Sequence, residues 1–477
     1  MPRGLRLVAA VILTGWLSFS VSSPVLADSR SGNQQIPYLP ALQPQVEFWK
    51  QVFATYSSRE VMIHDTEHLE RVYSVLDFRS LADAGLSDAE FEASKKAEVA
   101  DEKDRIRGLL LHIHQVGGES SELSEEERRI AALFDKERGS YQFLEAAADD
   151  RIRSQSGLRE RFAAGIEISR RYLPEMEAIF RREGVPVALT RLPLVESCFN
   201  VNAYSKVGAA GIWQFMPGTG RLYMRVDGAA DERRDPIAST LAAAQHLKRD
   251  YEALGAWPLA ITAYNHGRGG VARAVSTLNS TDLQEIVRHY KGPAFKFASR
   301  NFYAEFLAAL EVEQNFEEYL GPLNPHYPLA IEYILVPDRV PFALLARSVQ
   351  TPAGELAELN PALSDAVVSG RLSVPAGYSL RVPLGSSDGF EGRYAVLSAA
   401  ERASQPPRRA RGKTKVARGA AKASAKKKTV THRVQPGQTL STIAKRYGTS
   451  VQAIRRHNGL RNGSGVRSGQ NLVIPKG

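Results

Sequence analysis

One acidic residue in an apolar setting is the first feature of this sequence that could perform chemistry. Leu189, Leu192 and Val195 recur at a spacing of three, which gives a short helix one apolar face, and Glu196 follows at the end of that helix. Apolar surroundings disfavour the charged form of a carboxyl group and so raise its pKa. A carboxylic acid that keeps its proton near neutral pH is suited to protonating a glycosidic oxygen.

The residues that follow supply groups that suit a sugar. Turn-forming residues, Ser205 among them, surround the run 211–215. In that run Trp213 and Phe215 have flat faces for sugar rings, and the amide of Gln214 suits hydroxyl or acetamido groups. The alternative is that Glu196 is an ordinary acid at a helix end and that Trp213 is a core aromatic.

Helical segments are expected to position these groups. Apolar residues recur at helical spacing from Val46 onward, and a second helix is predicted over 69–76. Ser87–Glu90 and Ser124–Glu127 match the capping box at a helix start. We therefore expect an all-helical N-terminal region over 45–175, with its histidines solvated or packed, followed by a mostly helical domain over 176–325.

The pattern changes after residue 330. Strand-like runs at 331–336 and 380–382 bracket a helical stretch over 342–359, which suggests a small module over 331–385. Residues 431–475 predict strand, helix, helix and strand, with Pro436-Gly437 as a turn. The fold class is thus mainly α, with one or two small βααβ modules.

The positive charge of the chain is confined to one segment. The formal net charge is +10, and residues 401–429 hold eleven Lys or Arg and one acid. We expect a disordered basic linker over 400–429, since it lacks apolar residues to bury. The rest is close to neutral, which argues against a nucleic-acid-binding fold. We expect the linker to span the wall or to touch anionic envelope surfaces.

The remaining signals concern cysteine, metals and export. The one cysteine, Cys198, allows no intramolecular disulfide and is expected to be a small buried residue; no metal or cofactor site is predicted. Residues 1–27 have a basic start, an apolar run and a small-residue cleavage site, and so read as a signal peptide. We expect an exported protein, periplasmic or associated with the cell wall; an uncleaved anchor is the alternative, and no transmembrane partner is implied.

Several motifs in order resemble the soluble lytic transglycosylase fold family, which is related to goose-type lysozymes. They are Glu196-Ser197, Ser205, Gly208-Ala209, Gly211-Ile212-Trp213-Gln214, Ala263-Tyr264-Asn265-His266-Gly267 and Tyr303. The resemblance implies a lysozyme-like helical catalytic domain. Two positions depart from the usual pattern: Trp213 stands where many relatives carry Met, and His266 where a small residue is usual.

That resemblance implies a reaction on peptidoglycan. Glu196 would be the sole acid/base, cleaving the N-acetylmuramic acid–N-acetylglucosamine bond and closing a 1,6-anhydro ring without water. Ser205 and Tyr303 would orient Glu196, while Gln214, Tyr264 and Asn265 would hold the sugar. From the residues alone, Tyr264 could equally be a core aromatic, and Asn265 could mark a helix stop.

The last module resembles the LysM family. The matching residues include Val434, Pro436-Gly437, Thr439-Leu440, Ile443-Ala444, Tyr447-Gly448, Asn458 and Gly469-Gln470. This resemblance implies binding to glycans that contain N-acetylglucosamine, such as peptidoglycan strands. Residues 331–385 look like a diverged copy, whose role is either glycan binding or only sealing the fold.

Two other functions remain open at this point. A hydrolytic muramidase would use the same fold with an additional Asp to position water, and Asp227, Asp231 and Asp235 are available. A non-catalytic peptidoglycan-binding scaffold would keep the fold without needing Glu196.

Overall fold

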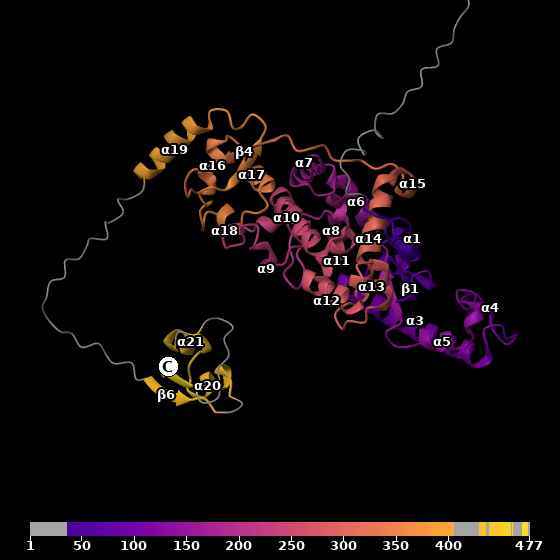
Figure 1. Cartoon of the computed structure of the whole chain (residues 1–477). Helices are drawn as coiled ribbons and strands as arrows, with labels where there is room; N and C mark the ends of the chain where they lie inside the picture. Colours follow the sequence, from indigo (N-terminus) through magenta and orange to yellow (C-terminus); the bar gives the residue numbers. More distant parts are fainter. Residues whose placement is uncertain (1–35, 405–428, 436–437, 459, 461–469, 476–477) are drawn as a thin grey trace, which may run out of the picture. The chain divides into compact units, whose positions relative to one another are not determined.

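The computed structural model describes residues 36–404, 429–435, 438–458, 460 and 470–475 (Figure 1). The chain divides into two compact units, residues 1–404 and 405–477, which are described separately. The predicted signal peptide and most of the predicted basic linker lie outside the described residues. Among the described residues, no helix is both long enough and apolar enough to cross a bilayer.

The N-terminal region contains a sheet that the sequence analysis missed. Three antiparallel strands, β1 (Glu60–Asp65), β2 (Val72–Asp77) and β3 (Ile152–Ser156), lie in the order β2-β1-β3. The prediction of an all-helical region over 45–175, with a helix over 69–76, is therefore wrong. Val72 to Asp77 is rich in β-branched and aromatic residues and pairs along β1, which outweighs its apparent helical spacing.

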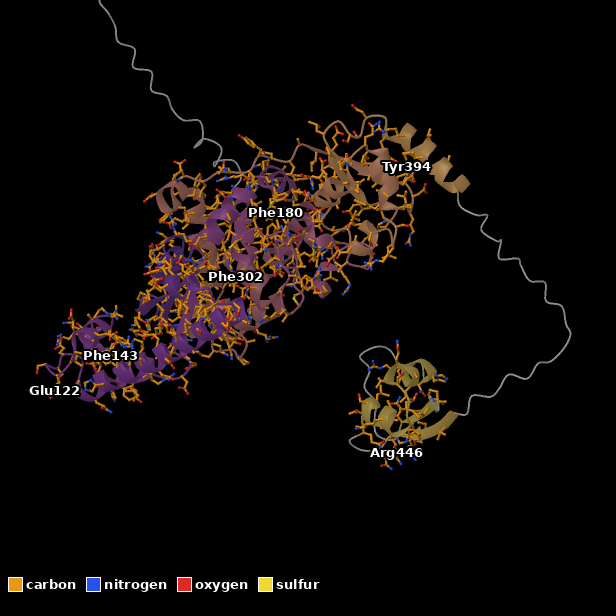
Figure 2. All side chains as sticks on the ribbon, turned by 180° about the vertical axis from the view of Figure 1, so that it is seen from behind. Glu122, Phe143, Phe180, Phe302, Tyr394 and Arg446 are labelled. Atoms are coloured by element: carbon orange, nitrogen blue, oxygen red, sulfur yellow. The ribbon has the colours of Figure 1, made fainter. Side chains whose placement is uncertain are left out.

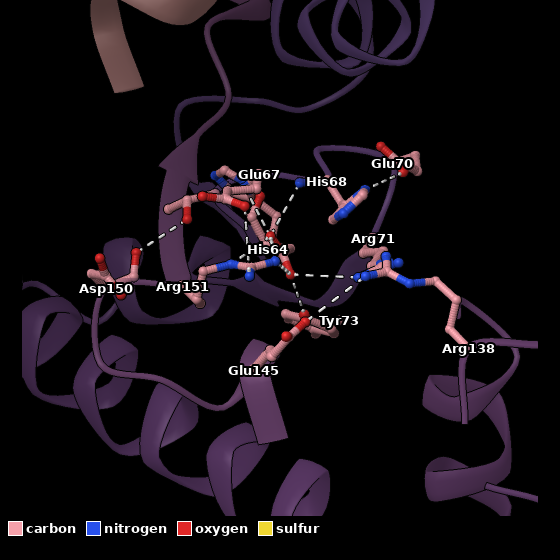
Figure 3. Close-up of polar contacts among 12 residues, drawn as sticks. His64, Glu67, His68, Glu70, Arg71, Tyr73, Arg138, Glu145, Asp150 and Arg151 are labelled. Carbon is pink, nitrogen blue, oxygen red and sulfur yellow. Dashed lines mark hydrogen bonds and ion pairs between the residues drawn. The ribbon is translucent and has the colours of Figure 1, made fainter. Parts of the chain in front are cut away.

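The buried carboxylate of Asp65 ties the three strands together. Figure 3 labels its partners Arg151 and Tyr73. Asp65, at the end of β1, is fully buried and accepts two hydrogen bonds from Arg151, which directly precedes β3, at 2.8 Å. It also accepts the Tyr73 hydroxyl of β2 at 3.1 Å. Its neighbour His64 is fully buried as well and packs against the ring of Phe48, which agrees with the expectation of a packed histidine.

The predicted helices of this region are present around the sheet. Ser87 and Ser124 begin α3 and α4, and both capping boxes form as expected. Helix α1 packs against the distant α14, so this region is part of the same folded body as the residues that follow. The helices and short 3₁₀ turns up to residue 158 are η1 (Pro40–Leu42), α1 (Gln43–Ala54), α2 (Arg79–Ala82), α3 (Asp88–Val116), α4 (Glu125–Ala131), η2 (Lys136–Arg138) and α5 (Tyr141–Ala146).

Residues 159–320 form a helical body around one apolar core. Phe180 of α7 and Phe302 of α14 are buried within it (Figure 2). Helix α11 packs against both α10 and α14, and α14 also packs against α8. The elements are α6 (Arg159–Ser169), α7 (Leu173–Glu183), η3 (Val187–Arg191), α8 (Leu192–Ser197), α9 (Pro217–Gly220), η4 (Glu232–Arg234), α10 (Pro236–Leu254), α11 (Trp257–His266), α12 (Arg268–Leu278), α13 (Leu283–His289), α14 (Phe297–Gln314) and α15 (Phe316–Leu320).

The small module after residue 330 has the predicted strand, helix, helix and strand. Strand β4 (Ile331–Leu335) pairs antiparallel with β5 (Ser379–Pro383), and α16 (Phe342–Ser348) and α17 (Ala353–Leu359) lie between them in the chain. A short α18 (Asp365–Val368) follows α17, and α19 (Phe390–Ser404) packs against α16. The start of the predicted disordered linker, residues 400–404, is therefore helical instead.

The second unit has the same order of elements. Strand β6 (Thr429–Arg433) pairs antiparallel with β7 (Asn471–Pro475). Helices α20 (Leu440–Arg446) and α21 (Val451–Asn458) supply Ile443 and Ile454 to a core that also contains Leu472. The predicted βααβ arrangement is confirmed, although the Pro436-Gly437 turn lies outside the described residues.

Candidate active site

Glu196 lies at the end of a very short helix, as predicted. Pro193 stands in the first turn of α8, and the helix stops because Cys198 and Phe199 both take left-handed backbone conformations, with φ of 49° and 54°. The Glu196 side chain is half-buried, and burial raises its pKa to about 8. The carboxyl group therefore carries its proton at neutral pH, which is the state that a general acid needs. Cys198 is half-buried rather than fully buried, and burial raises the pKa of its thiol to about 11.

A hydroxyl next to the acid connects α8 to the loop over 203–216. The Ser197 hydroxyl donates to the carbonyl oxygen of Ile212 at 2.9 Å. Ser205 shapes the same loop, because its hydroxyl accepts the Ala209 N–H at 2.8 Å. Ser205 forms no hydrogen bond with Glu196 in the described structure, so its predicted orienting role is corrected to a turn-forming one.

The side chain of Arg233 holds the loop over 203–216 in place. The Arg233 guanidinium donates to the carbonyl oxygens of Gly208 and Phe215 at 2.7 and 2.9 Å. Gly211 has φ of 74°, and a Cβ atom at this position would lie 1.8 Å from the Arg233 carbonyl oxygen. Only glycine therefore allows the loop to approach the 231–235 segment so closely.

Trp213 and Phe215 are core residues rather than sugar platforms. Trp213 is 0% exposed, stacks on Phe180, and donates its indole N–H to the Thr240 hydroxyl at 2.9 Å. Phe215 is 3% exposed. Neither ring has a free face, so the prediction that they stack on sugar rings is wrong. Their bulk instead fixes the backbone that carries Gln214.

Tyr264 joins the acid to this loop. Its hydroxyl donates to the Trp213 carbonyl oxygen at 2.8 Å, and burial together with the charge of Glu196 raises its pKa well above the usual value. Tyr264 therefore interacts electrostatically with Glu196 and holds the loop, while its predicted contact with the sugar stays a prediction. Gln214 is half-exposed with φ of 48°, and its amide donates to the Gly211 carbonyl oxygen at 2.8 Å.

Asn265 is exposed at the end of α11 and is held from the side. The Ser299 hydroxyl donates to its side-chain oxygen at 3.3 Å, and His266 contacts the same hydroxyl at 2.9 Å. His266, which departs from the family pattern, therefore belongs to a short series of polar contacts that orients Asn265. The side-chain amide of Asn265 remains accessible to a ligand.

Tyr303 has a different partner from the one predicted. It is fully buried, and its hydroxyl donates to the carbonyl oxygen of Pro37 at 2.5 Å, which ties α14 to the start of the described chain. It forms no hydrogen bond with Glu196 within the described residues. Its predicted role in orienting the acid is therefore wrong.

Two parts of the chain match known protein families. Residues 176–287 match the transglycosylase SLT domain, and residues 432–475 match the LysM domain. The chain carries an SLT domain and a LysM domain. Glu196, Gln214, Tyr264 and Asn265 all lie within the SLT match.

Individual proteins are similar to parts of this chain. Membrane-bound lytic murein transglycosylase D of Escherichia coli is 29% identical over 312 residues, which cover 62% of this chain and 62% of that protein's own length. A putative tributyltin chloride resistance protein of an Alteromonas species is 34% identical over 113 residues, 23% of this chain and 54% of the relative. The solved structure of an inactive mutant of lytic transglycosylase Slt from Pseudomonas aeruginosa covers 39% of this chain and 28% of its own, at 18% identity and a TM-score of 0.28.

The three aspartates that a hydrolytic SLT-like site could use have structural partners. Asp227 accepts the backbone N–H groups of Ala229 and Ala230, at 2.8 and 3.0 Å. Asp231 pairs with Arg233 at 2.6 Å, and Asp235 pairs with Arg381. These contacts occupy all three carboxylates away from Glu196.

A second acid near the SLT domain's Glu196 was missed by the sequence analysis. Glu305 lies on α14, beyond the family match, and burial together with the charge of Glu196 raises its pKa to about 8. The signal was present in the sequence: Glu305 is the one acid in the otherwise apolar run 302–310.

An exposed aromatic ring on the loop was missed as well. Tyr204 is 67% exposed, although the loop that carries it is held by backbone pairing between Tyr204 and Ala210. A tyrosine kept in solvent on a constrained loop of the SLT domain is available to stack on a sugar ring.

Proposed function

We propose that this chain is a peptidoglycan lytic transglycosylase that cleaves the β-1,4 bond between N-acetylmuramic acid and N-acetylglucosamine. The observation that carries the proposal is Glu196, a half-buried carboxyl group protonated at neutral pH beside Tyr264 of the SLT domain. The name of the E. coli relative, a lytic murein transglycosylase, supports the same reaction.

In the first step Glu196 gives its proton to the glycosidic oxygen while the bond from that oxygen to C1 of the muramoyl sugar breaks. The resulting carboxylate then takes the proton of the C6 hydroxyl as that oxygen bonds to C1. The product is a 1,6-anhydromuramoyl end, water is not consumed, and Glu196 regains its proton. Gln214 and Asn265 are placed to hold the sugar through their amides.

The LysM domain supplies binding to the same polymer, peptidoglycan glycan strands. The predicted signal peptide and the membrane-bound relative support an exported protein that works in the cell envelope. The basic stretch within the predicted linker, 400–429, would touch anionic envelope surfaces. A variant that lacks this segment should be washed from isolated envelopes at lower salt than the full chain.

A hydrolytic muramidase is the second candidate, and one observation favours it. Glu305 provides a second carboxyl group near Glu196, and ordinary glycoside hydrolases use two. A non-catalytic scaffold is the third candidate.

Digestion of purified sacculi with mass analysis of the products separates the three functions. Anhydro ends support the proposal, whereas reducing muramoyl ends support the hydrolase. Glu196→Gln should abolish release of either product. If the wild-type chain binds sacculi and releases nothing, and the substitution changes nothing, the scaffold is correct.

A further inference from the structure

His266, the last residue of α11, is held between groups from other parts of the SLT body. Its ring lies edge-on to the buried ring of Phe295, with the centroids 5.0 Å apart and the planes at 89°. The ring also lies against Gly270 in the first turn of α12, where an added Cβ atom would be 2.5 Å from Nε2 of His266. The imidazole therefore occupies a place that only a glycine at 270 leaves open.

One hydrogen atom decides the direction of the polar contacts between His266 and Asn265. The buried Ser299 hydroxyl, at the start of α14, has a single hydrogen, which it donates to the side-chain oxygen of Asn265 at 3.3 Å. The same hydroxyl oxygen lies 2.9 Å from Nδ1 of His266. Because the hydroxyl has no second hydrogen to give, Nδ1 of His266 donates to it. A neutral imidazole in this arrangement carries its proton on Nδ1.

The surroundings of the other ring nitrogen favour the same arrangement. Nε2 of His266 lies over the first turn of α12, against Gly270. The free backbone N–H groups at the start of a helix carry partial positive charge, and Arg273 follows one turn further along the same helix. Positive charge on that side disfavours a proton on Nε2. Burial, together with the charge of Arg273, also lowers the pKa of His266, so the ring is neutral at neutral pH.

We propose that His266 is a positioning residue that acts through Ser299 and fixes which end of the Asn265 side-chain amide is available to the sugar. This inference rests on the proposed function. Since Ser299 holds the amide oxygen, the NH₂ group of the exposed Asn265 is left to bind the ligand. An NH₂ group binds an oxygen that accepts hydrogen bonds, such as the carbonyl oxygen of an N-acetyl group, and it does not bind an ammonium group.

Steady-state kinetics of the full-length chain on sacculi test this positioning role. His266→Leu removes the donor, so the Asn265 amide is free to turn over, and KM should rise by about 3–10-fold while kcat stays within about twofold. His266→Asn places an amide N–H near the position of Nδ1 and should restore KM to within about twofold of wild type. An unchanged KM in folded His266→Leu protein, or an equal rise in KM in His266→Asn, would overturn the inference.

Two neighbouring glycines of α12 provide a matched pair of variants that keeps every hydrogen-bonding group. Gly270→Ala places a methyl group against the imidazole, so it should raise KM as His266→Leu does. Gly269→Ala is the control, because nothing lies within 4 Å of its added Cβ atom, and it should leave KM and kcat unchanged. In a His266→Asn background the ring is absent, and Gly270→Ala should lose its effect. An effect that persists in that background would contradict a role exerted through His266.

Nitrogen NMR of the wild-type chain supplies a measurement that depends neither on the folding of a variant nor on catalysis. Spectra of ¹⁵N-labelled histidine side chains at about pH 7.5 report which ring nitrogen carries the proton. The signals of His266 are assigned through its contact with the Phe295 ring. A proton on Nδ1 supports the inference, and a proton on Nε2 refutes it. If the wild type releases no anhydro ends from sacculi, the proposed function fails, while the NMR result still decides whether this hydrogen-bond order exists.

Discussion

Arg381 of β5 forms a buried ion pair with Asp235, the residue that caps α10 of the SLT domain. The same Asp235 carboxylate accepts the backbone N–H groups of Ile237 and Ala238 at 2.9 and 3.0 Å. The module over 331–383 is therefore fastened to the helical body through the start of one of its long helices. This contact supports the view that the diverged copy of the LysM pattern seals the fold.

Removing the basic partner of this pair should be costly. Arg381→Met leaves the Asp235 carboxylate buried without its cation, and we expect the free energy of unfolding to fall by about 3–5 kcal/mol. Chemical denaturation of the full chain measures the change. Arg371→Met, at an exposed arginine of the same module, should change stability by less than about 0.5 kcal/mol. Equal effects of the two substitutions would show that the ion pair does not fasten the module.

Replacing Glu196 should stabilise the protein at alkaline pH. Burial raises the pKa of Glu196 from 4.5 to about 8, so the folded state binds more protons than the unfolded state between these values. The stability that this acid contributes is present below pH 4.5 and is lost as the pH rises through 8. Above pH 6 the Glu196→Gln variant should therefore unfold at a higher temperature than wild type. At pH 8 its free energy of unfolding should exceed that of wild type by on the order of 1–3 kcal/mol. A constant difference from pH 4 to pH 9 would contradict this.

One buried and one half-buried histidine should make the fold sensitive to acid. Burial lowers the pKa of His64 and of His246 from 6.5 to about 4. Between pH 6.5 and pH 4 the unfolded chain takes up protons that the folded chain refuses, so stability falls as the pH falls through this window. In His64→Phe the free energy of unfolding should depend less on pH, and at pH 4 it should lose up to about 3 kcal/mol less than wild type does. His289→Gln, at an exposed histidine, should leave the unfolding curve as it is.

Two aromatic substitutions should distinguish a residue that packs in the core from a residue that contacts the ligand. Trp213→Phe loses volume and the hydrogen bond to Thr240, so stability should fall by about 2 kcal/mol while KM for sacculi stays the same. Tyr204→Ala removes an exposed ring, so KM should rise by roughly 2–10-fold with unchanged unfolding temperature. If Trp213→Phe raised KM and Tyr204→Ala lowered stability instead, Trp213 would contact the sugar and Tyr204 would not.

The sequence sufficed where the deciding interactions are local. The capping boxes at Ser87 and Ser124 involve residues three apart, and the end of α8 at Glu196 depends on its immediate neighbours. The β6–β7 module was also predictable, because the apolar residues of its two helices recur at regular helical spacing.

The misses have long-range causes. The sheet that contains β2 is completed by β3 (Ile152–Ser156), which pairs with β1 from far along the chain. Trp213 is enclosed by Phe180 and Thr240, which lie 33 and 27 residues away in the sequence. Residue type alone could not distinguish its enclosed ring from one that faces solvent. Glu305 was overlooked because its meaning depends on the packing of α14 against α8.

The hydrogen bonds that hold the loop over 203–216 extend past the family match. The Ala362 carbonyl oxygen accepts the Asp231 N–H at 2.8 Å, and Asp231 in turn holds the Arg233 guanidinium that grips the carbonyl oxygens of Gly208 and Phe215. A fragment trimmed to residues 176–287 would keep Glu196, Gln214, Tyr264 and Asn265 yet lose both this brace and Glu305. We therefore expect that a stable form of this loop needs residues of the 331–385 module as well as those of the family match.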